Sequence, residues 1–169
     1  MNEQVQTELK RIFNGRFSTS ESTRANYARG EDTYDPILSK AVVFPETNEE
    51  VSKILKLCNE HKIPVVPFGT GTSLEGNVVG NEKGITVSLE KMNKILNVNV
   101  EDFDCRVQAC VTKEQLNDYL REDGVFFPID PGANAAIGGM ASTSASGTMA
   151  VKYGTMKTVI SGLTVVLPN

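Results

Sequence analysis

The stretch VVPFGTGTSLEGN, residues 65–77, places three glycines and three hydroxyl residues directly behind an apolar run. Glycine in this position costs stability unless the backbone needs a positive φ or must come very close to another group. Successive main-chain amides in such a loop can bind a phosphate. Taken alone, the loop leaves phosphate binding and a plain tight turn as equal alternatives.

Two common phosphate loops are excluded by the spacing of these glycines. A P-loop requires a lysine directly after its last glycine, and none follows here. The dinucleotide fingerprint Gly-x-Gly-x-x-Gly fits Gly69 and Gly71, but the third glycine, Gly76, comes two residues late. The residues after it, 77–80, also do not begin an amphipathic helix.

A second glycine-rich stretch favours ligand binding over a plain tight turn. DPGANAAIGGMASTSASG, residues 130–147, contains four glycines, an apolar Ile137 and several hydroxyl residues. Its small residues allow a flat ring or a pyrophosphate to approach the backbone, and its hydroxyls can donate to phosphate or ribose oxygens. The competing interpretation is a small-residue helix packed closely against a sheet. Two such loops in one chain favour a ligand held between two lobes.

Composition and charge narrow the class of protein. The 169 residues are 40% hydrophobic and 22% charged, which is typical of a globular protein, and the net charge of −4 argues against nucleic-acid binding. Residues 131–151 carry no charge but are rich in small residues, so we predict buried backbone around a ligand and no membrane span.

The N-terminus lacks the apolar core of a secretory signal, and we expect a cytoplasmic protein. Cys58, Cys105 and Cys110 are predicted to be buried free thiols.

The first part of the chain predicts two helices and two parallel strands. Apolar residues at helical spacing predict a helix over 3–13, and residues 24–40 are expected to run over the surface. A short strand at 41–45 precedes a helix that begins at Thr47, with Glu50 completing a capping box, and ends near Lys62. Its buried stripe is predicted as Val51, Ile54, Leu55 and Cys58. A strand at 63–68 then completes a parallel crossover.

The second part predicts mainly antiparallel structure. Residues 85–89 alternate as a strand, and 95–111 form a hairpin around EDFD, with Leu96, Val98 and Val100 sharing one face. Thr112 and Gln115 cap a helix that turns Leu116, Tyr119 and Leu120 inward and stops at Gly124. Residues 160–168 are predicted as a final strand whose apolar edge is open. Because Pro168 and Asn169 are turn residues, we expect the chain to be part of a longer protein.

At this point the two loops resemble a known family. Residues 66–76 are similar to the first pyrophosphate loop of flavoproteins of the vanillyl-alcohol oxidase and p-cresol methylhydroxylase type. Asp130-Pro131-Gly132, with 137–140 and 145–147, is similar to their second FAD loop, and 151–156 to the segment that follows. The resemblance covers residues 25–169 and is nearest to FAD-linked D-lactate dehydrogenases and the glycolate oxidase D subunit.

The resemblance implies an α+β fold of the PCMH type, with FAD extended between two subdomains and the second subdomain incomplete. We therefore expect an N-terminal lead-in at 1–40, a first subdomain at 41–90 that holds the loop 69–76, and a truncated second subdomain at 91–169, without a substrate domain. The implied FAD contacts are Phe68, Gly69, Thr70, Gly71, Thr72, Ser73, Asp130, Pro131, Gly132, Ile137, Gly138, Gly139, Thr143, Ser146, Gly147, Tyr153 and Gly154.

Within that set, residues 69–73 would hold the pyrophosphate, residues 130–136 would run beside the flavin and ribityl chain, and residues 143–147 would return to the phosphates. Tyr153 and Gly154 would lie near the ring. Where relatives with covalent flavin carry a histidine, this chain has Thr72, so the resemblance implies non-covalent FAD. It also implies a flavin-dependent oxidoreductase that acts on a small 2-hydroxy acid, D-lactate or glycolate.

No residue of the chain is assigned to catalysis or to a metal. The single histidine, His61, is expected at the end of a helix in a solvated or structural role. Removal of hydride from a hydroxy acid needs a base, and the sequence identifies none. The alternative is a non-catalytic module that forms a homodimer through its open final strand. A weaker alternative is a nucleotide-sugar enzyme of the same fold, such as the reductase of peptidoglycan synthesis.

Overall fold

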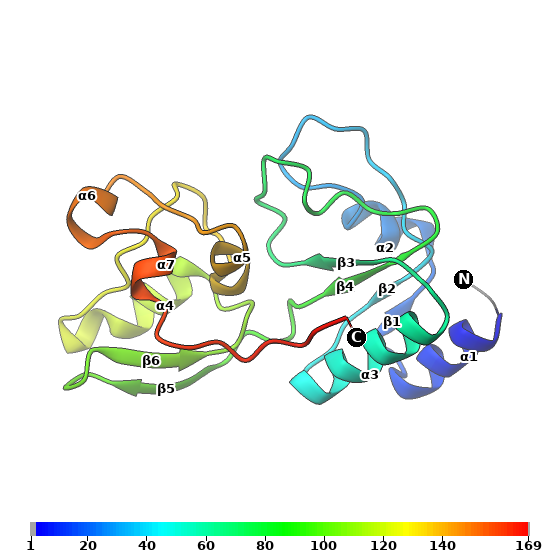
Figure 1. Cartoon of the computed structure of the whole chain (residues 1–169), viewed down its shortest axis with the longest axis horizontal. Coiled ribbons are helices and arrows are strands. Elements are labelled where there is room, and N and C mark those ends of the chain that lie inside the picture. Colours follow the sequence, from blue (N-terminus) through cyan, green and yellow to red (C-terminus); the bar gives the residue numbers. More distant parts are fainter. Residues whose placement is uncertain (1–2, 169) are drawn as a thin grey trace. The chain divides into compact units, whose positions relative to one another are not determined.

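The computed structural model describes residues 3–168, which divide into two compact units. The first contains the chain up to Lys91 together with the residues from Thr164 on, and the second contains Met92–Leu163. Each unit mixes helices and sheet, which confirms the predicted α+β class (Figure 1). The two units are described separately below.

A four-stranded sheet organises the first unit, in the order β1-β2-β4-β3. β1 pairs antiparallel with β2, whereas β4 lies between β2 and β3 and is parallel to both. The predicted parallel relation of the strands around residues 41–45 and 63–68 is therefore confirmed, with β4 inserted between them. The strands are β1 (Phe17–Ser18), β2 (Val42–Val43), β3 (Val65–Phe68) and β4 (Ile85–Ser88).

Helices α1 (Glu3–Ile12) and α3 (Asn48–Glu60) share one apolar core with this sheet. Figure 1 shows both helices on the same side of the strands. From the predicted stripe of α3, Ile54 and Cys58 are buried, but Val51 and Leu55 are only partly so and Leu57 is buried instead. Burial raises the pKa of the Cys58 thiol to about 11, so this cysteine is an unreactive core residue.

The predicted capping box at the start of α3 is only half present. The Thr47 hydroxyl accepts from the Glu50 amide as expected. The Glu50 carboxylate, however, accepts from the Glu46 amide at 2.7 Å and from the guanidinium of Arg16. A long-range cation thus outcompetes the local partner, because an ion pair with two hydrogen bonds is stronger than a single bond to a neutral amide.

The opposite face of β4 is polar and buried. Thr86 and Ser88 are fully buried, and the Thr86 hydroxyl donates to Ser39 Oγ at 2.8 Å. The segment that covers this face includes α2 (Glu21–Asn26) and the loop after it, whose Ala28 and Asp32 are buried. Residues 24–40 run mostly over the surface, as predicted, but Ala28, Asp32 and Ser39 are buried, so the segment also covers part of the second face of the sheet.

An antiparallel hairpin of β5 (Ile95–Asn99) and β6 (Asp104–Val107) begins the second unit, as predicted. A bulge shifts the register between Ile95 and Asn97, so Ile95, Val98 and Val107 pack against the core while Leu96 is 54% exposed. The predicted alternation of Leu96, Val98 and Val100 is wrong for this reason, since one extra residue moves side chains to the other face. Cys105 on β6 is also exposed, so the prediction that its thiol is buried is wrong.

Beyond the hairpin, short helices joined by loops make up the second unit. The Thr112 hydroxyl caps α4 by accepting from the Gln115 amide, and Leu116 and Leu120 face the core. Tyr119 is 58% exposed, contrary to prediction. Gly124 ends this region with a φ of +71°. The helices of this unit are α4 (Lys113–Leu120), η1 (Arg121–Asp123), α5 (Ile137–Ser142), α6 (Ala150–Tyr153) and α7 (Met156–Val159).

The predicted final strand is absent from the described chain, because residues 160–168 pair with no other strand. Their apolar side chains nevertheless alternate, with Leu163, Val165 and Leu167 each more than 60% exposed. The turn expected at Pro168-Asn169 falls partly outside the described residues. No helix within 3–168 has the length and apolar character needed to cross a bilayer.

Candidate functional site

The first glycine loop leaves the sheet at the end of β3 and turns at Gly71, whose φ is +75°. A Cβ added to Gly71 would lie 2.9 Å from Cζ of Phe68. Glycine is therefore required here both by the left-handed backbone and by the close phenyl ring. Phe68 is itself 6% exposed and contacts Tyr27 edge-on, with ring centroids 5.0 Å apart. The loop thus begins on a rigid aromatic support.

Main-chain donors of this loop are available for a ligand. The N–H groups of Gly71, Thr72 and Ser73 donate to no other group among residues 3–168. The side chains of Thr70 and Thr72 lie close together, with their hydroxyl oxygens 3.3 Å apart. Consecutive free amides next to a left-handed glycine form the kind of concave site that binds a phosphate without a cation. The loop therefore fits a diphosphate group.

The segment of residues 30–34 holds this loop, and the sequence interpretation missed it. The Glu31 amide donates to Gly71 O at 2.9 Å, and a Cβ on Gly30 would lie 2.5 Å from the same oxygen. A Cβ on Gly76 would meet the ring of Tyr34 at 2.7 Å. The only signal in the sequence was the turn-forming composition of GEDTYDP, residues 30–36. Figure 1 shows the segment around residue 30 running beside the loop that follows β3.

The second glycine stretch is organised around Asp130 in the second unit. Its Oδ1 accepts from Lys113 Nζ at 2.8 Å and from the Gly132 amide at 3.1 Å. The bond from Lys113, followed by the bond from Gly132, lowers the pKa of the Asp130 carboxyl. A Cβ on Gly147 would lie 1.7 Å from Asp130 O, so the two ends of the stretch meet at this residue.

The first residues of helix α5 make close backbone contact with residues 109–111, which follow β6. The Gly138 amide donates to Ala109 O at 2.8 Å, and the Ile137 amide donates to Val111 O at 2.8 Å. A Cβ on Gly138 would lie 2.8 Å from that of Ala109, whereas Gly139 has open space where its Cβ would be. Gly138 is thus a packing glycine, whereas Gly139 is exposed and has no close neighbour at its Cβ position.

The hydroxyls of the second stretch differ in availability. Ser142 Oγ donates to Gly138 O and Thr143 Oγ1 to Gly139 O, so both bond back within α5. In contrast, the main-chain N–H groups of Ser146 and Gly147 donate to no group within the described residues. The free amides at 146–147 can donate to a phosphate, whereas the hydroxyls of Ser142 and Thr143 already donate within α5.

Tyr153 and Gly154 close this region at the end of α6. The Tyr153 ring contacts Phe126 edge-on at 5.5 Å, and Lys152 Nζ lies 4.9 Å from the Tyr153 ring centroid. Gly154 has a φ of +81°, and a Cβ there would lie 2.6 Å from Thr158 Oγ1. Tyr153 thus contacts Phe126 and Lys152 within its own unit.

The predicted site residues therefore form two groups, one in each unit. The expectation that both loops grip one diphosphate stays a prediction. Among residues 3–168, no group of three His, Cys, Asp or Glu side chains is suited to hold a metal ion. His61 is exposed at the C-terminal cap of α3.

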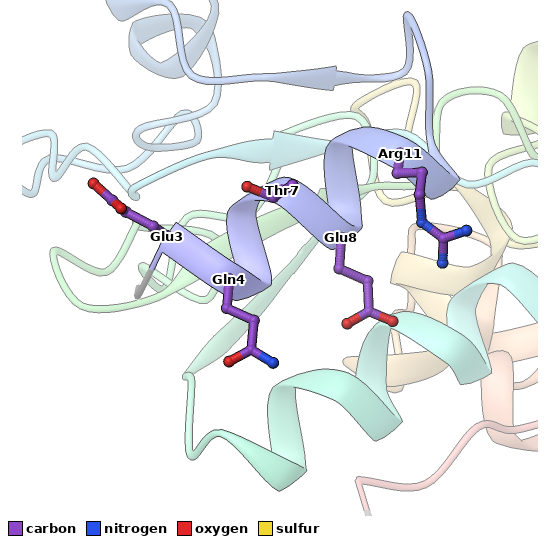
Figure 2. Close-up of a pocket in the computed structure, with 5 residues that line it drawn as sticks. All are labelled: Glu3, Gln4, Thr7, Glu8 and Arg11. Carbon is purple, nitrogen blue, oxygen red and sulfur yellow. The ribbon is translucent and has the colours of Figure 1, made fainter.

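Two open hollows lie in the first unit. One, of about 370 Å³, borders the first loop at Gly76 and is lined also by Tyr34, Asp35 and Glu75. The other, of about 510 Å³, lies along α1. Figure 2 shows that its side chains all come from that helix, so it lacks groups converging from different elements and is a poor candidate for a cofactor. Its lining residues are Glu3, Gln4, Thr7, Glu8 and Arg11.

The fold mixes helices and sheet, and the amides at 71–73 and 146–147 donate to no group within residues 3–168. The more specific assignment comes from comparison, because a sequence model of the FAD binding domain family matches residues 39–169. The chain belongs to this family, and FAD is its cofactor. The first loop and the stretch 130–147 both lie within the match.

Two relatives agree with this assignment, and a solved structure shares the fold. The chain is 46% identical over 90% of its length to the probable mitochondrial D-lactate dehydrogenase of Danio rerio. It is 32% identical, also over 90% of its length, to the glycolate oxidase subunit GlcD of Bacillus subtilis. It covers 31% and 33% of these two proteins. Alkyldihydroxyacetonephosphate synthase has the same fold over 99% of this chain and 33% of its own, with a TM-score of 0.90 at 22% identity.

Proposed function

We propose that the chain is the FAD-binding part of a flavin-dependent oxidoreductase that oxidises a small 2-hydroxy acid, D-lactate or glycolate, to the 2-oxo acid. The observation that carries the proposal is the row of free amides at Gly71, Thr72 and Ser73, directly after a strand of a domain in the FAD binding family. The names of the relatives, D-lactate dehydrogenase and glycolate oxidase subunit, support the substrate class.

Both groups of predicted residues contribute to the proposed site. In the first unit, the amides of 71–73 bind the pyrophosphate. In the second, Asp130, Pro131 and Gly132 run beside the flavin, the open space at Gly139 admits the cofactor, and the amides of 146–147 reach the phosphates. Thr72 stands where covalent relatives carry a histidine, so FAD is bound non-covalently. These roles rest on the resemblance described above together with the free donors and open space.

FAD held by these residues would supply the redox chemistry, which is acceptance of a hydride from the substrate. The residues of this chain bind and orient it, because free amides and left-handed glycines form the cradle for its phosphates. None of them is proposed as the base that removes the hydroxyl proton. We therefore propose that residues 1–169 bind FAD without turning over D-lactate or glycolate.

The binding experiment is a titration of the purified chain with FAD, followed by visible absorption after removal of free cofactor. We expect the yellow colour of bound flavin in the wild type and its loss in the double variant Gly69→Val, Gly139→Val. Gly162→Val serves as the control, because a Cβ at Gly162 meets nothing within 4 Å. A double variant that retains FAD as well as the wild type would contradict the proposed cradle.

The proposal also includes subdomain boundaries, partners and a cellular location. The lead-in 1–40, the subdomain 41–90 and the subdomain 91–169 are proposed as its functional divisions. A small 2-hydroxy acid is the partner, and the acidic net charge of −4 supports the absence of nucleic-acid binding. A cytoplasmic location is part of the proposal, whereas the name of the Danio rerio relative carries the word mitochondrial.

A second candidate is a non-catalytic module that self-associates through residues 160–168. The observation that favours it is the exposed apolar row of Leu163, Val165 and Leu167 on a segment that pairs with no strand among residues 3–168. Such a segment can add to a second copy through main-chain hydrogen bonds. Light scattering over a hundredfold concentration range should then show a dimer that Val165→Lys abolishes and Thr164→Lys retains. A strict monomer would rule out this candidate.

A further inference from the structure

A buried carboxylate lies behind the first glycine loop and outside the part of the chain that the family model matches. Asp32 is 7% exposed, although aspartate is rarely buried without partners. Its Oδ2 accepts from the Gly30 amide and its Oδ1 from the Tyr34 amide, each at 3.0 Å. The side chain thus holds together the turn of residues 30–34 from its centre.

The two residues that Asp32 fixes are also residues that touch the glycine loop. Gly30 approaches so closely that a Cβ on it would lie 2.5 Å from Gly71 O and 2.9 Å from Ser73 O. At the other end of the turn, the ring of Tyr34 would lie 2.7 Å from a Cβ on Gly76. Between them, the Glu31 amide donates to Gly71 O. The turn therefore contacts the loop at its start, middle and end.

The contact at Gly71 has a direct consequence for the free amides. Because Gly71 O points toward the turn and accepts a hydrogen bond from it, the peptide plane between Gly71 and Thr72 is fixed in orientation. The Thr72 N–H belongs to the same planar peptide and must point away from that carbonyl oxygen. The turn thus determines the direction in which a donor of the loop is presented.

We infer that Asp32 is a positioning residue that holds the first glycine loop in its phosphate-binding shape, so that the FAD site depends on the turn 30–34. This inference rests on the proposed FAD binding, because it assigns a role to a residue that supports the loop without touching the cofactor. It adds a segment that the family match, residues 39–169, leaves out.

Two different variants test the role of the turn, each with a matched control. Asp32→Asn keeps the size of the side chain but presents an NH₂ group to one of the two amides, and the exposed neighbour Asp35→Asn is its control. Gly30→Ala places a methyl group against Gly71 O without requiring a left-handed backbone. Its control is Gly162→Ala, where a methyl group meets nothing within 4 Å.

The first measurement is amide hydrogen exchange without FAD. We expect the Glu31 N–H to exchange at least tenfold faster in Asp32→Asn and Gly30→Ala than in the controls. The Thr86 N–H, which donates to Ala41 O within the sheet, should change less than threefold. This contrast separates loosening of the loop from a general loss of stability, which would accelerate both amides. Equal acceleration of both, or none at Glu31, would overturn the inference.

The second measurement is the dissociation constant for FAD, obtained by titration of each variant. We expect an increase of at least tenfold for Asp32→Asn and Gly30→Ala, and less than twofold for the controls. Unchanged FAD affinity in both variants would refute the inference even if the loop loosens. If the wild type itself binds no FAD, the proposed function of this chain fails, while the exchange data still decide whether Asp32 holds the loop. Unfolding of both variants at 25 °C would also refute the inference about Asp32, because the turn would then support the whole first unit and not the loop alone.

Discussion

Arg16 and Glu50 form a two-pronged ion pair across 34 residues of sequence. Arg16 Nη1 lies 2.6 Å from Glu50 Oε2, and Nη2 lies 2.6 Å from Oε1. Arg16 also donates to Phe44 O at 3.1 Å. The pair therefore ties the connection between α1 and β1 to the first turn of α3, on the sheet that carries the first glycine loop. It is a stability element with consequences that can be measured.

Substitution Glu50→Gln should lower the free energy of unfolding by about 1–2 kcal/mol, because it removes the charge from a largely shielded bidentate pair. The side chains of Arg16 and Glu50 are only 22% and 20% exposed, which limits screening by solvent. Urea denaturation followed by circular dichroism measures the change. Glu60→Gln, at the exposed end of the same helix, should shift stability by less than about 0.5 kcal/mol. Equal effects of the two variants would contradict this role of the pair.

The same pair predicts a dependence of stability on pH. The hydrogen bonds from Arg16 lower the pKa of the Glu50 carboxyl to about 2 from its ordinary 4.5. Because the folded state has the lower pKa, the contribution of this group is fully present above pH 4.5 and is lost as the pH falls toward 2. Thermal unfolding between pH 6 and pH 2 should show a smaller acid-induced drop in Glu50→Gln than in the wild type. Parallel curves would contradict this assignment.

The junction of Gly147 with Asp130 predicts opposite effects of two glycine-to-alanine changes. Gly147→Ala should destabilise the second unit by about 1–3 kcal/mol, because its Cβ would collide with Asp130 O and the backbone would have to move. Gly139→Ala, in open space on helix α5, should be neutral or stabilising by up to about 1 kcal/mol. Melting temperatures of the two variants provide the measurement, and a stable Gly147→Ala protein would show that the stretch is not closed at this point.

The contact between Lys113 and Asp130 predicts a change in one pKa. Lys113→Met keeps an apolar stem but removes the main cause that lowers the pKa of the Asp130 carboxyl. An NMR titration of the Asp130 side chain should therefore show a higher pKa in Lys113→Met than in the wild type. The bond from the Gly132 amide remains, so part of the lowering should persist. An unchanged Asp130 pKa would mean that the ion pair does not form in solution.

The order of elements and most of their types could be predicted from local patterns. The capping threonines Thr47 and Thr112, the hairpin around residues 101–104 and the stop at Gly124 all appear in the structure. These features depend on residues within one turn or one hairpin of each other, so their physical causes are readable from the chain. The two glycine loops were found for the same reason, since their composition is itself the local signal.

The errors in prediction came from interactions between distant parts of the chain. The bulge in β5 turns Leu96 outward. The Glu50 carboxylate binds Arg16 instead of the Thr47 amide that a capping box would require. The final strand was predicted from apolar alternation, but a strand also requires a partner with which to form hydrogen bonds, and residues 160–168 have none within the described chain.

The sequence by itself determined that two small-residue loops follow apolar segments in a mixed helix and sheet protein, because glycine content and periodicity act locally. Only the tertiary structure decided what holds the first loop. Asp32 and Gly30 lie about 40 residues before Gly71 in the chain, and their role appears only when the folded backbone brings the turn within hydrogen-bond distance. Contacts between such distant residues depend on the packing of the whole unit, which no local pattern encodes.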